Sequence, residues 1–349
     1  IFAGFTHRPA VELAEKLVKI LPSGLERVFY SDNGSTAVEV ALKMAFQYRV
    51  NRGEKRTTFV ALEDAYHGDT FGAMAASDGS AFTEPFKSLL FNVLRVAPKL
   101  GEIEQLLKTN GHEIAALIIE PMLQGAGGMK IFSADWLREI RRICTANDVL
   151  LIADEVLTGF GRTGKMFACE HGEISPDIIC LSKGLTAGYM PLGVTVATNE
   201  IYHAFYDDSR LKTFFHGHSF TANPLACAVA IASLELFETE KTLLRVHAIA
   251  AKFVGFAKKV AELPCVKEAR TIGGVVAIEL KSADGGYLDN AGPLLLREFL
   301  KRNILLRPLG NVLYFMPPYV ITDDEIEMVF GEISEVLDML QNGALENPE

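Results

Sequence analysis

Short, continuous apolar runs alternate along much of the chain with longer stretches of helical period. The runs are rich in β-branched residues and are typical of buried strands: Thr57–Leu62, Ala115–Ile119, Val149–Ala153 and Ile178–Leu181. Amphipathic stretches such as Thr36–Tyr48 and Asp135–Ala146 alternate with them. The alternation predicts an α/β fold with a mainly parallel sheet flanked by helices. Because ligands of such sheets bind beyond the carboxyl ends of the strands, polar residues directly after a strand are the first candidates for a site.

A second pattern begins near Glu238. The following stretches alternate between helical and strand-like: Thr242–Glu262, Gly274–Leu280, Leu288–Arg302, Ile304–Pro308, Val312–Met316 and a final helix from Asp323. That order resembles a small α+β domain rather than more of the parallel sheet. We therefore expect a large domain over residues 1–238 and a smaller C-terminal α+β domain over residues 239–349.

Composition excludes two classes of partner. The net charge is −10 and no basic run offsets it, which argues against a nucleic-acid ligand. No apolar stretch reaches the roughly 18 residues that would indicate a membrane-spanning helix. The five cysteines are widely spaced and form no CxxC pair, which argues against a zinc site and a disulfide framework. We therefore expect a cytoplasmic protein that holds no metal.

Asp32–Thr36 follows the strand-like Arg27–Tyr30 and opens a helix. Thr36 and Glu39 have the spacing of a capping box. Gly34 and Ser35 at this helix start form a candidate phosphate site, because free backbone N–H groups and the helix dipole both favour an anion there. An ordinary capped helix would explain the same residues.

Two further candidates follow predicted strands. Tyr66 or His67 could stack on an aromatic cofactor, although such a pair in a loop often makes only local hydrogen bonds. Asp154 ends the run Val149–Ala153, where a buried carboxylate requires a partner. A protonated pyridine nitrogen suits that role, since it turns the ring into an electron sink. The alternative, a metal ligand, lacks a second carboxylate or histidine at ligand spacing.

Lys183 follows the run Ile178–Leu181 and is flanked by the small residues Ser182 and Gly184. A lysine at a strand end, near a cationic cofactor and shielded from water, is a competent nucleophile. The alternative is a solvated surface lysine, one of 34 lysines and arginines. The position one strand after Asp154 favours the first interpretation.

Together these segments resemble the class III aminotransferases over nearly the whole chain. The shared motifs are Asp32–Thr36, Tyr66–Thr70, Ile118–Pro121, Asp154–Gly164, Leu181–Gly184 and His216–Phe220. The resemblance implies a fold-type I enzyme that depends on pyridoxal 5′-phosphate. It also implies that an N-terminal part of the large domain is absent from this sequence, which starts at Ile1.

The resemblance implies roles for individual residues. Gly34 and Ser35 would hold the cofactor phosphate, and Tyr66 would lie against cofactor and substrate. Asp154 would pair with the pyridine nitrogen. Lys183 would carry the cofactor covalently, contact the substrate and act as the catalytic proton carrier.

Other implied roles involve more distant segments. Gly217, His218 and Ser219 match a segment that reaches the phosphate and substrate of the neighbouring subunit, which implies a homodimer. Arg307 falls where the family holds a substrate carboxylate, a task that suits a bidentate guanidinium. A weaker candidate for the same pocket is Tyr314, while Glu120 and Gln124 would lie near the ring hydroxyl.

Four segments resemble the family members that aminate 8-amino-7-oxononanoate in biotin synthesis. They are Gly34–Ala41, Gln124–Met129, Phe215–Phe220 with Asn223–Cys227, and Tyr314–Tyr319. The donor in such members is usually S-adenosylmethionine and sometimes lysine, with ping-pong kinetics. The alternatives are an enzyme for another ω-amine (ornithine, acetylornithine, 4-aminobutyrate or a diamine), a glutamate-semialdehyde mutase, and a non-catalytic protein that binds pyridoxal phosphate.

Overall fold

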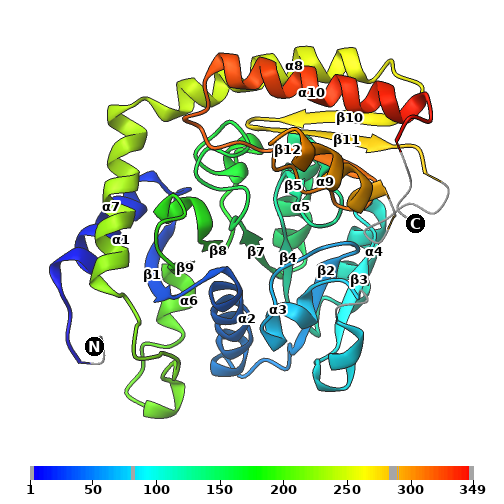
Figure 1. Ribbon diagram of the computed structural model, residues 1–349. Coiled ribbons are helices and arrows are strands. Elements are labelled where there is room, and N and C mark those ends of the chain that lie inside the picture. The colour runs from blue at the N-terminus through cyan, green and yellow to red at the C-terminus, as the bar shows by residue number, and fades with distance from the viewer. Residues whose placement is uncertain (1–3, 80–82, 283–288, 290, 346–349) are drawn as a thin grey trace. The chain divides into compact units, whose positions relative to one another are not determined.

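The computed structural model in Figure 1 describes residues 4–79, 83–282, 289 and 291–345. The chain divides into two compact units. The first comprises Ile1–Gly127, Phe132–Phe160 and Lys165–Glu240, and the second comprises Gly128–Ile131, Gly161–Gly164 and Lys241–Glu349. Two short segments from the middle of the chain therefore belong with the C-terminal unit.

A seven-stranded sheet with the order β1-β9-β8-β7-β4-β2-β3 forms the centre of the first unit. Its strands are β1 (Leu25–Ser31), β2 (Thr58–Leu62), β3 (Val93–Val96), β4 (Ile114–Ile119), β7 (Leu150–Asp154), β8 (Ile178–Leu181) and β9 (Gly193–Thr198). Neighbouring strands from β3 to β8 are parallel, while β9 runs antiparallel to both β8 and β1. The prediction of a mainly parallel sheet is confirmed.

Helices flank this sheet. They are α1 (Arg8–Ile20), α2 (Gly34–Asn51), α3 (Phe71–Ala76), α4 (Leu100–Asn110), α5 (Ala134–Ala146), α6 (Asn199–His203) and α7 (Pro224–Thr239), with 3-10 turns η1 (Glu84–Leu89), η2 (Ala168–His171), η3 (Lys183–Thr186) and η4 (Arg210–Lys212). Helix α2 contacts several strands, and Val38, Ala41 and Ala45 on it are fully buried. None of the helices in the described part of the chain combines the length and apolar character that a membrane crossing requires.

The start of α2 differs from the predicted capping box. Asn33 is the N-cap: its side chain accepts a hydrogen bond of 3.0 Å from the Thr36 N–H, and the Thr36 hydroxyl accepts one of 3.1 Å from the Asn33 N–H. The Glu39 carboxylate instead accepts a bond of 2.6 Å from the Gly72 N–H. The predicted pair of Thr36 and Glu39 was wrong, because asparagine is itself a strong N-cap three residues earlier.

The second unit packs helices on the antiparallel sheet β10-β11-β12. Its elements are β6 (Lys130–Ile131), α8 (Thr242–Val260), β10 (Val266–Ile272), β11 (Val275–Leu280), α9 (Ala291–Lys301), β12 (Val312–Phe315) and α10 (Asp323–Gln341). The short strand β5 (Leu123–Gln124) belongs to the first unit. Phe256 of α8 stacks on Phe330 of α10 with ring centroids 4.0 Å apart. The predicted start of a helix at Leu288 lies outside the described residues.

The predicted strand at Ile304–Pro308 is wrong. In this segment Ile304 and Leu306 are buried and Leu305 is exposed, which is the alternation of a strand. However, only an isolated bridge between Leu309 and Val312 forms in this region of the described chain. Pro308 has no amide donor, so the segment is poorly suited to a sheet ladder.

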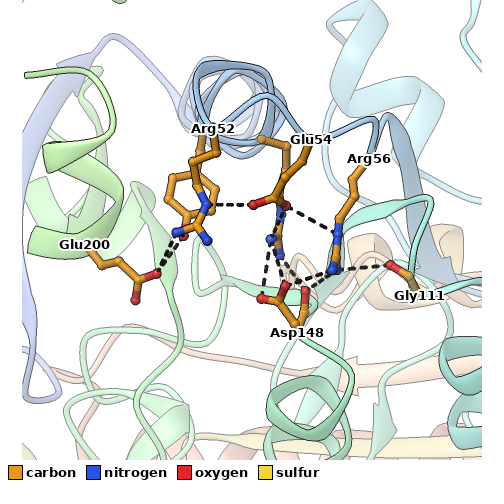
Figure 2. Close-up of polar contacts among 8 residues, drawn as sticks. Arg52, Glu54, Arg56, Gly111, Asp148 and Glu200 are labelled. Atoms are coloured by element: carbon orange, nitrogen blue, oxygen red, sulfur yellow. Dashed lines mark hydrogen bonds and ion pairs between the residues drawn. The ribbon is translucent and has the colours of Figure 1, made fainter. Parts of the chain in front are cut away.

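A charged network closes the amino edge of the large sheet, in the turns before β2, β4 and β7 (Figure 2). The Arg49 side chain is fully buried, and its Nη1 lies 2.8 Å from Glu54 Oε2 and 3.3 Å from Asp148 Oδ2. Arg56 Nη2 lies 2.8 Å from the same Asp148 oxygen. Arg52 Nε donates to Glu54 Oε1 at 2.6 Å. These five residues are called the amino-edge network below.

Candidate active site

The candidate residues gather at one edge of the large sheet, the carboxyl edge, after five of the strands that end there. Strands β2, β4, β7 and β8 are parallel, and β1 has the same direction because β1 and β8 are both antiparallel to β9. Gly34 follows β1, Tyr66 follows β2, Glu120 follows β4, Asp154 ends β7 and Lys183 follows β8. The fold therefore brings these residues to the edge where ligands of such sheets bind.

Asp154 is a buried carboxylate with two hydrogen-bond donors. Its Oδ2 lies 2.7 Å from His67 Nδ1, and its Oδ1 accepts a bond of 3.1 Å from the Val156 N–H. A carboxylate can only accept, so Nδ1 carries the hydrogen. His67 is itself buried, and its Nε2 has no hydrogen-bond partner among the described residues. This pair fixes the orientation of the carboxylate.

Glu120 is a second buried carboxylate at this edge. It accepts hydrogen bonds from the Tyr66 N–H at 3.0 Å and from the Gly125 N–H at 2.9 Å. Burial raises the pKa of Glu120 to about 7. Gln124 donates to the Glu63 carbonyl at 3.0 Å, while its buried Oε1 finds no partner in the described chain. Glu120 thus ties the loop after β2 to the turn after β4.

Tyr66 is half-exposed, and its hydroxyl donates to Asp69 Oδ2 at 3.0 Å. Burial, followed by the neighbouring Asp69 carboxylate, raises the pKa of Tyr66 to about 12, so the phenol stays protonated. The Asp69 N–H donates to Ser35 Oγ at 3.1 Å. Gly68 has φ +130°, and a Cβ there would overlap the Ser35 side chain. The loop after β2 therefore packs directly on the start of α2.

Within the described chain, the start of α2 leaves backbone N–H donors available for an anion. The Asn33 cap engages the N–H groups of Thr36 and Ala37 and does not involve those of Gly34 and Ser35. Since Ser35 Oγ accepts from Asp69, its own hydrogen can be donated elsewhere. Two N–H groups and a hydroxyl at the positive end of a helix suit a phosphate.

Lys183 begins η3 with a left-handed backbone, φ +39°. A lysine in this conformation costs about 1–3 kcal/mol, which the surrounding contacts offset. The preceding Ser182 hydroxyl donates to the Leu192 carbonyl at 2.7 Å. A Cβ on the following Gly184 would lie 2.9 Å from Cβ of Phe160. The Lys183 backbone is thus fixed on both sides, while Lys183 itself is exposed.

Glu155, the residue after Asp154, is a third buried carboxylate at the end of β7. It is fully buried and accepts hydrogen bonds from the Ala168 N–H at 2.6 Å, the Cys169 N–H at 2.8 Å and the Thr158 hydroxyl at 3.1 Å. Burial raises the pKa of Glu155 to about 7. The side chain fastens η2 to the end of β7.

The remaining candidates lie on other segments. Gly217, His218 and Ser219 belong to the connection between α6 and α7, where the His218 N–H donates to Thr221 Oγ1 at 3.1 Å. His218 Nε2 is buried and has no partner among the described residues. Arg307 is exposed and belongs to the second unit, so its role stays a prediction.

The residues present fit pyridoxal 5′-phosphate. The carboxyl edge offers an oriented carboxylate for a protonated ring nitrogen, a helix start for a phosphate, and an exposed strand-end amine for an aldehyde. Two buried polar atoms next to these groups, His67 Nε2 and Gln124 Oε1, lack partners in the described chain, as expected of a site built around a polar ligand.

Known proteins are similar to this chain in both sequence and fold. Adenosylmethionine-8-amino-7-oxononanoate aminotransferase of Synechococcus elongatus is 48% identical over 97% of this chain and 82% of its own length. The crystal structure of the enzyme of that name from Methanocaldococcus jannaschii matches with a TM-score of 0.93 and 39% identity, over 97% of this chain and 81% of that one. A PLP-bound amine transaminase from an uncultivated Pseudomonas species matches with a TM-score of 0.89 and 33% identity, over 96% and 82%.

These comparisons confirm the predicted cofactor, pyridoxal 5′-phosphate, and the fold-type I architecture. The sequence pattern of one family, Aminotransferase class-III, matches residues 1–337. The chain belongs to the class III aminotransferase family.

Proposed function

We propose that this chain transfers an amino group to 8-amino-7-oxononanoate, giving 7,8-diaminononanoate for biotin synthesis. The observation that carries the proposal is the 48% identity, over 97% of the chain, to a relative named for this reaction. S-adenosylmethionine is the proposed donor, since that name includes it. The proposed compartment is the cytoplasm.

When bound, pyridoxal phosphate supplies the electron sink that makes a substrate C–H bond acidic. Asp154, oriented by His67, holds the proton on the ring nitrogen. Gly34 and Ser35 bind the phosphate through the start of α2. Lys183 holds the cofactor through its amine and, as the catalytic base, moves a proton at the substrate carbon.

For the substrate, we propose that Tyr66 and Arg307 are binding residues. The Tyr66 ring is half-exposed. Because its hydroxyl donates a hydrogen bond to Asp69, the orientation of the ring is fixed. Arg307 is exposed, and a guanidinium can bind the substrate carboxylate through two parallel hydrogen bonds.

We also propose a homodimer in which Gly217, His218 and Ser219 serve the neighbouring subunit's cofactor and substrate. The connection between α6 and α7 carries exposed large apolar side chains: Tyr206, Leu211, Phe215 and Phe220. Such a concentration of exposed apolar side chains is typical of an interaction surface. A second copy of this chain is the proposed occupant.

The test is an assay of purified chain, loaded with pyridoxal phosphate, with S-adenosylmethionine and 8-amino-7-oxononanoate. We expect 7,8-diaminononanoate by mass spectrometry and parallel-line ping-pong kinetics. Lysine as donor in place of S-adenosylmethionine would change only the donor assignment. Amination of 2-oxoglutarate by ornithine, 4-aminobutyrate or a diamine, with none of oxononanoate, would contradict the proposal.

A further inference from the structure

A row of polar side chains on α2 holds the connection between α6 and α7. Asn51 Nδ2 donates to the carbonyls of Ala204 and Lys212, both at 3.1 Å. One turn earlier, Gln47 Nε2 donates to the carbonyls of Lys212 at 3.2 Å and Thr213 at 3.0 Å. The row continues one more turn to Lys43.

Lys43 Nζ lies 2.9 Å from His216 Nδ1 and 5.5 Å from the centre of the Phe214 ring. The spacing of four residues places Lys43, Gln47 and Asn51 along one face of the helix. Within the described chain, the hydrogen bonds and the ring contact of these three side chains are all made to the stretch from Ala204 to His216, which immediately precedes Gly217–Ser219. We call these three residues the α2 row.

Aromatic contacts also hold the connection between α6 and α7 in place. Phe214 packs edge-on against Phe29 of β1 at 5.5 Å and against Phe205 at 5.7 Å, and it stacks on His216 at 5.8 Å. The outer side chains, including Phe215, are exposed. The connection thus has an inner face fixed to the first unit and an apolar outer face, and Figure 1 shows it projecting at the lower left.

We propose that the α2 row positions Gly217–Ser219 for the active site of the neighbouring subunit. This inference rests on the proposed homodimer. It gives α2 two tasks: its first residues, Gly34 and Ser35, bind the phosphate of its own subunit, and its last two turns fix the segment that completes the partner's site. Disturbing the row therefore impairs the partner's site and leaves the row's own subunit competent.

Gln47→Leu is the test variant, because leucine keeps most of the side-chain volume and removes both donated hydrogen bonds. Gln105→Leu on α4 is the matched control, since the Gln105 side chain is exposed and, in the described part of the chain, its amide donates only to Thr109 within its own helix. We expect the Gln47→Leu homodimer to lose about tenfold in kcat/KM, as a small displacement of a binding segment can do. Gln105→Leu should retain wild-type activity.

Mixed dimers purified through two affinity tags separate action within a subunit from action across subunits. The reference pairs a wild-type chain with a Lys183→Ala chain and has one working site. In the first mixture, a Gln47→Leu chain is paired with a Lys183→Ala chain. Its working site receives Gly217–Ser219 from the chain with an intact row, so we expect the activity of the reference.

In the second mixture, a wild-type chain is paired with a chain that carries both Lys183→Ala and Gln47→Leu. The working site now receives the disturbed segment, so its activity should fall about tenfold. The reverse pattern, or wild-type activity of the Gln47→Leu homodimer, would overturn the inference. If Gln47→Leu melts below Gln105→Leu, Lys43→Met at the exposed end of the row replaces it in both mixtures, with the same expected order. A wild-type chain that runs as a monomer would instead contradict the proposed homodimer.

Discussion

Buried ionisable side chains have different partners at the two edges of the large sheet. At the amino edge, Arg49 is fully buried and its charge is balanced by the carboxylates of Glu54 and Asp148. At the carboxyl edge, the buried carboxylates of Glu120 and Glu155 accept hydrogen bonds from neutral backbone N–H groups. The amino edge thus pairs charge with charge, although Arg49 Nε finds no partner in the described chain. At the carboxyl edge, His67 Nε2 and Gln124 Oε1 lack partners among the described residues. Stability is concentrated at one edge and ligand chemistry at the other.

The edges also respond to pH in opposite directions. Although burial raises the pKa of Glu54, hydrogen bonds from Arg52 and Arg49 outweigh it and hold that pKa below its ordinary value. Glu54 therefore stabilises the fold above its unfolded pKa and loses this contribution as the pH falls. Glu120 and Glu155, whose pKa values burial raises to about 7, favour the fold below their unfolded pKa and lose that contribution as the pH rises toward 7.

The largest expected effect is that of Lys183→Ala. The turnover number should fall by about 10⁴-fold, because the variant loses both the nucleophile and the proton carrier. The melting temperature of the protein without cofactor should not fall, since Lys183 is exposed. Lys165→Ala, at another exposed lysine of the first unit, is the control. Turnover by Lys183→Ala near the wild-type rate would contradict the role.

The next effect belongs to the amino edge and concerns stability alone. Arg49→Met should lower the free energy of unfolding by about 3 kcal/mol, because a buried ion pair loses one partner. Arg52→Met, in the same network but about half-exposed, should cost less than about 1 kcal/mol. Urea titrations measure both. A lower kcat per folded Arg49→Met molecule would contradict the claim that the amino edge contributes to stability and not to catalysis.

His67→Leu, at the carboxyl edge, should mainly lower activity, in contrast to Arg49→Met. Losing a hydrogen bond to a charged group is worth about 1.5–3 kcal/mol, or roughly 10- to 100-fold in kcat/KM if the bond orients Asp154 in the transition state. His67→Asn, whose amide can replace Nδ1 as the donor, should recover part of the activity. The control is His112→Leu at an exposed histidine. Equal activity of His67→Leu and His67→Asn would exclude the orienting role.

The smallest expected effect is a change in how steeply the free energy of unfolding depends on pH. A wild-type Glu155 that ionises only near pH 7 adds up to about 1.4 kcal/mol per pH unit to the fall in stability between roughly pH 4.5 and 7. Glu155→Gln should flatten that fall, as shown by unfolding free energies at pH 5, 6 and 7. Glu54→Gln should leave the slope between pH 5 and 7 unchanged, because the contribution of Glu54 is lost only as the pH falls below its unfolded pKa. Parallel slopes for wild type and Glu155→Gln would mean that Glu155 is ionised throughout this range.

The sequence predicts the buried strands well and the long-range contacts poorly. Ile178–Leu181 and the run before Asp154 were recognised because a strand covered on both faces is continuously apolar. The antiparallel β9 was not predicted, because Gly193–Thr198 has no alternation that distinguishes its direction. The contact between His67 and Asp154 joins residues 87 positions apart and leaves no local pattern.

The site shows the same limit. The spacing of Gly34, Asp154 and Lys183 after separate strands was enough to place them at one edge of the sheet. The cap at Asn33 was missed, because Thr36 and Glu39 satisfy the same rule of spacing, and only the packing of α3 shows that Glu39 binds the Gly72 N–H instead. Burial, which raises the pKa of Glu120 and Glu155, is likewise a property of the folded chain.

The role of Lys183 is tested most directly by identifying the lysine that holds the cofactor. The chain loaded with pyridoxal phosphate is reduced with borohydride, which fixes the cofactor to that lysine, and is then digested and mapped by mass spectrometry. We expect the added mass on the peptide that contains Lys183. The same mass on a peptide with any other lysine, or on none, would contradict this role.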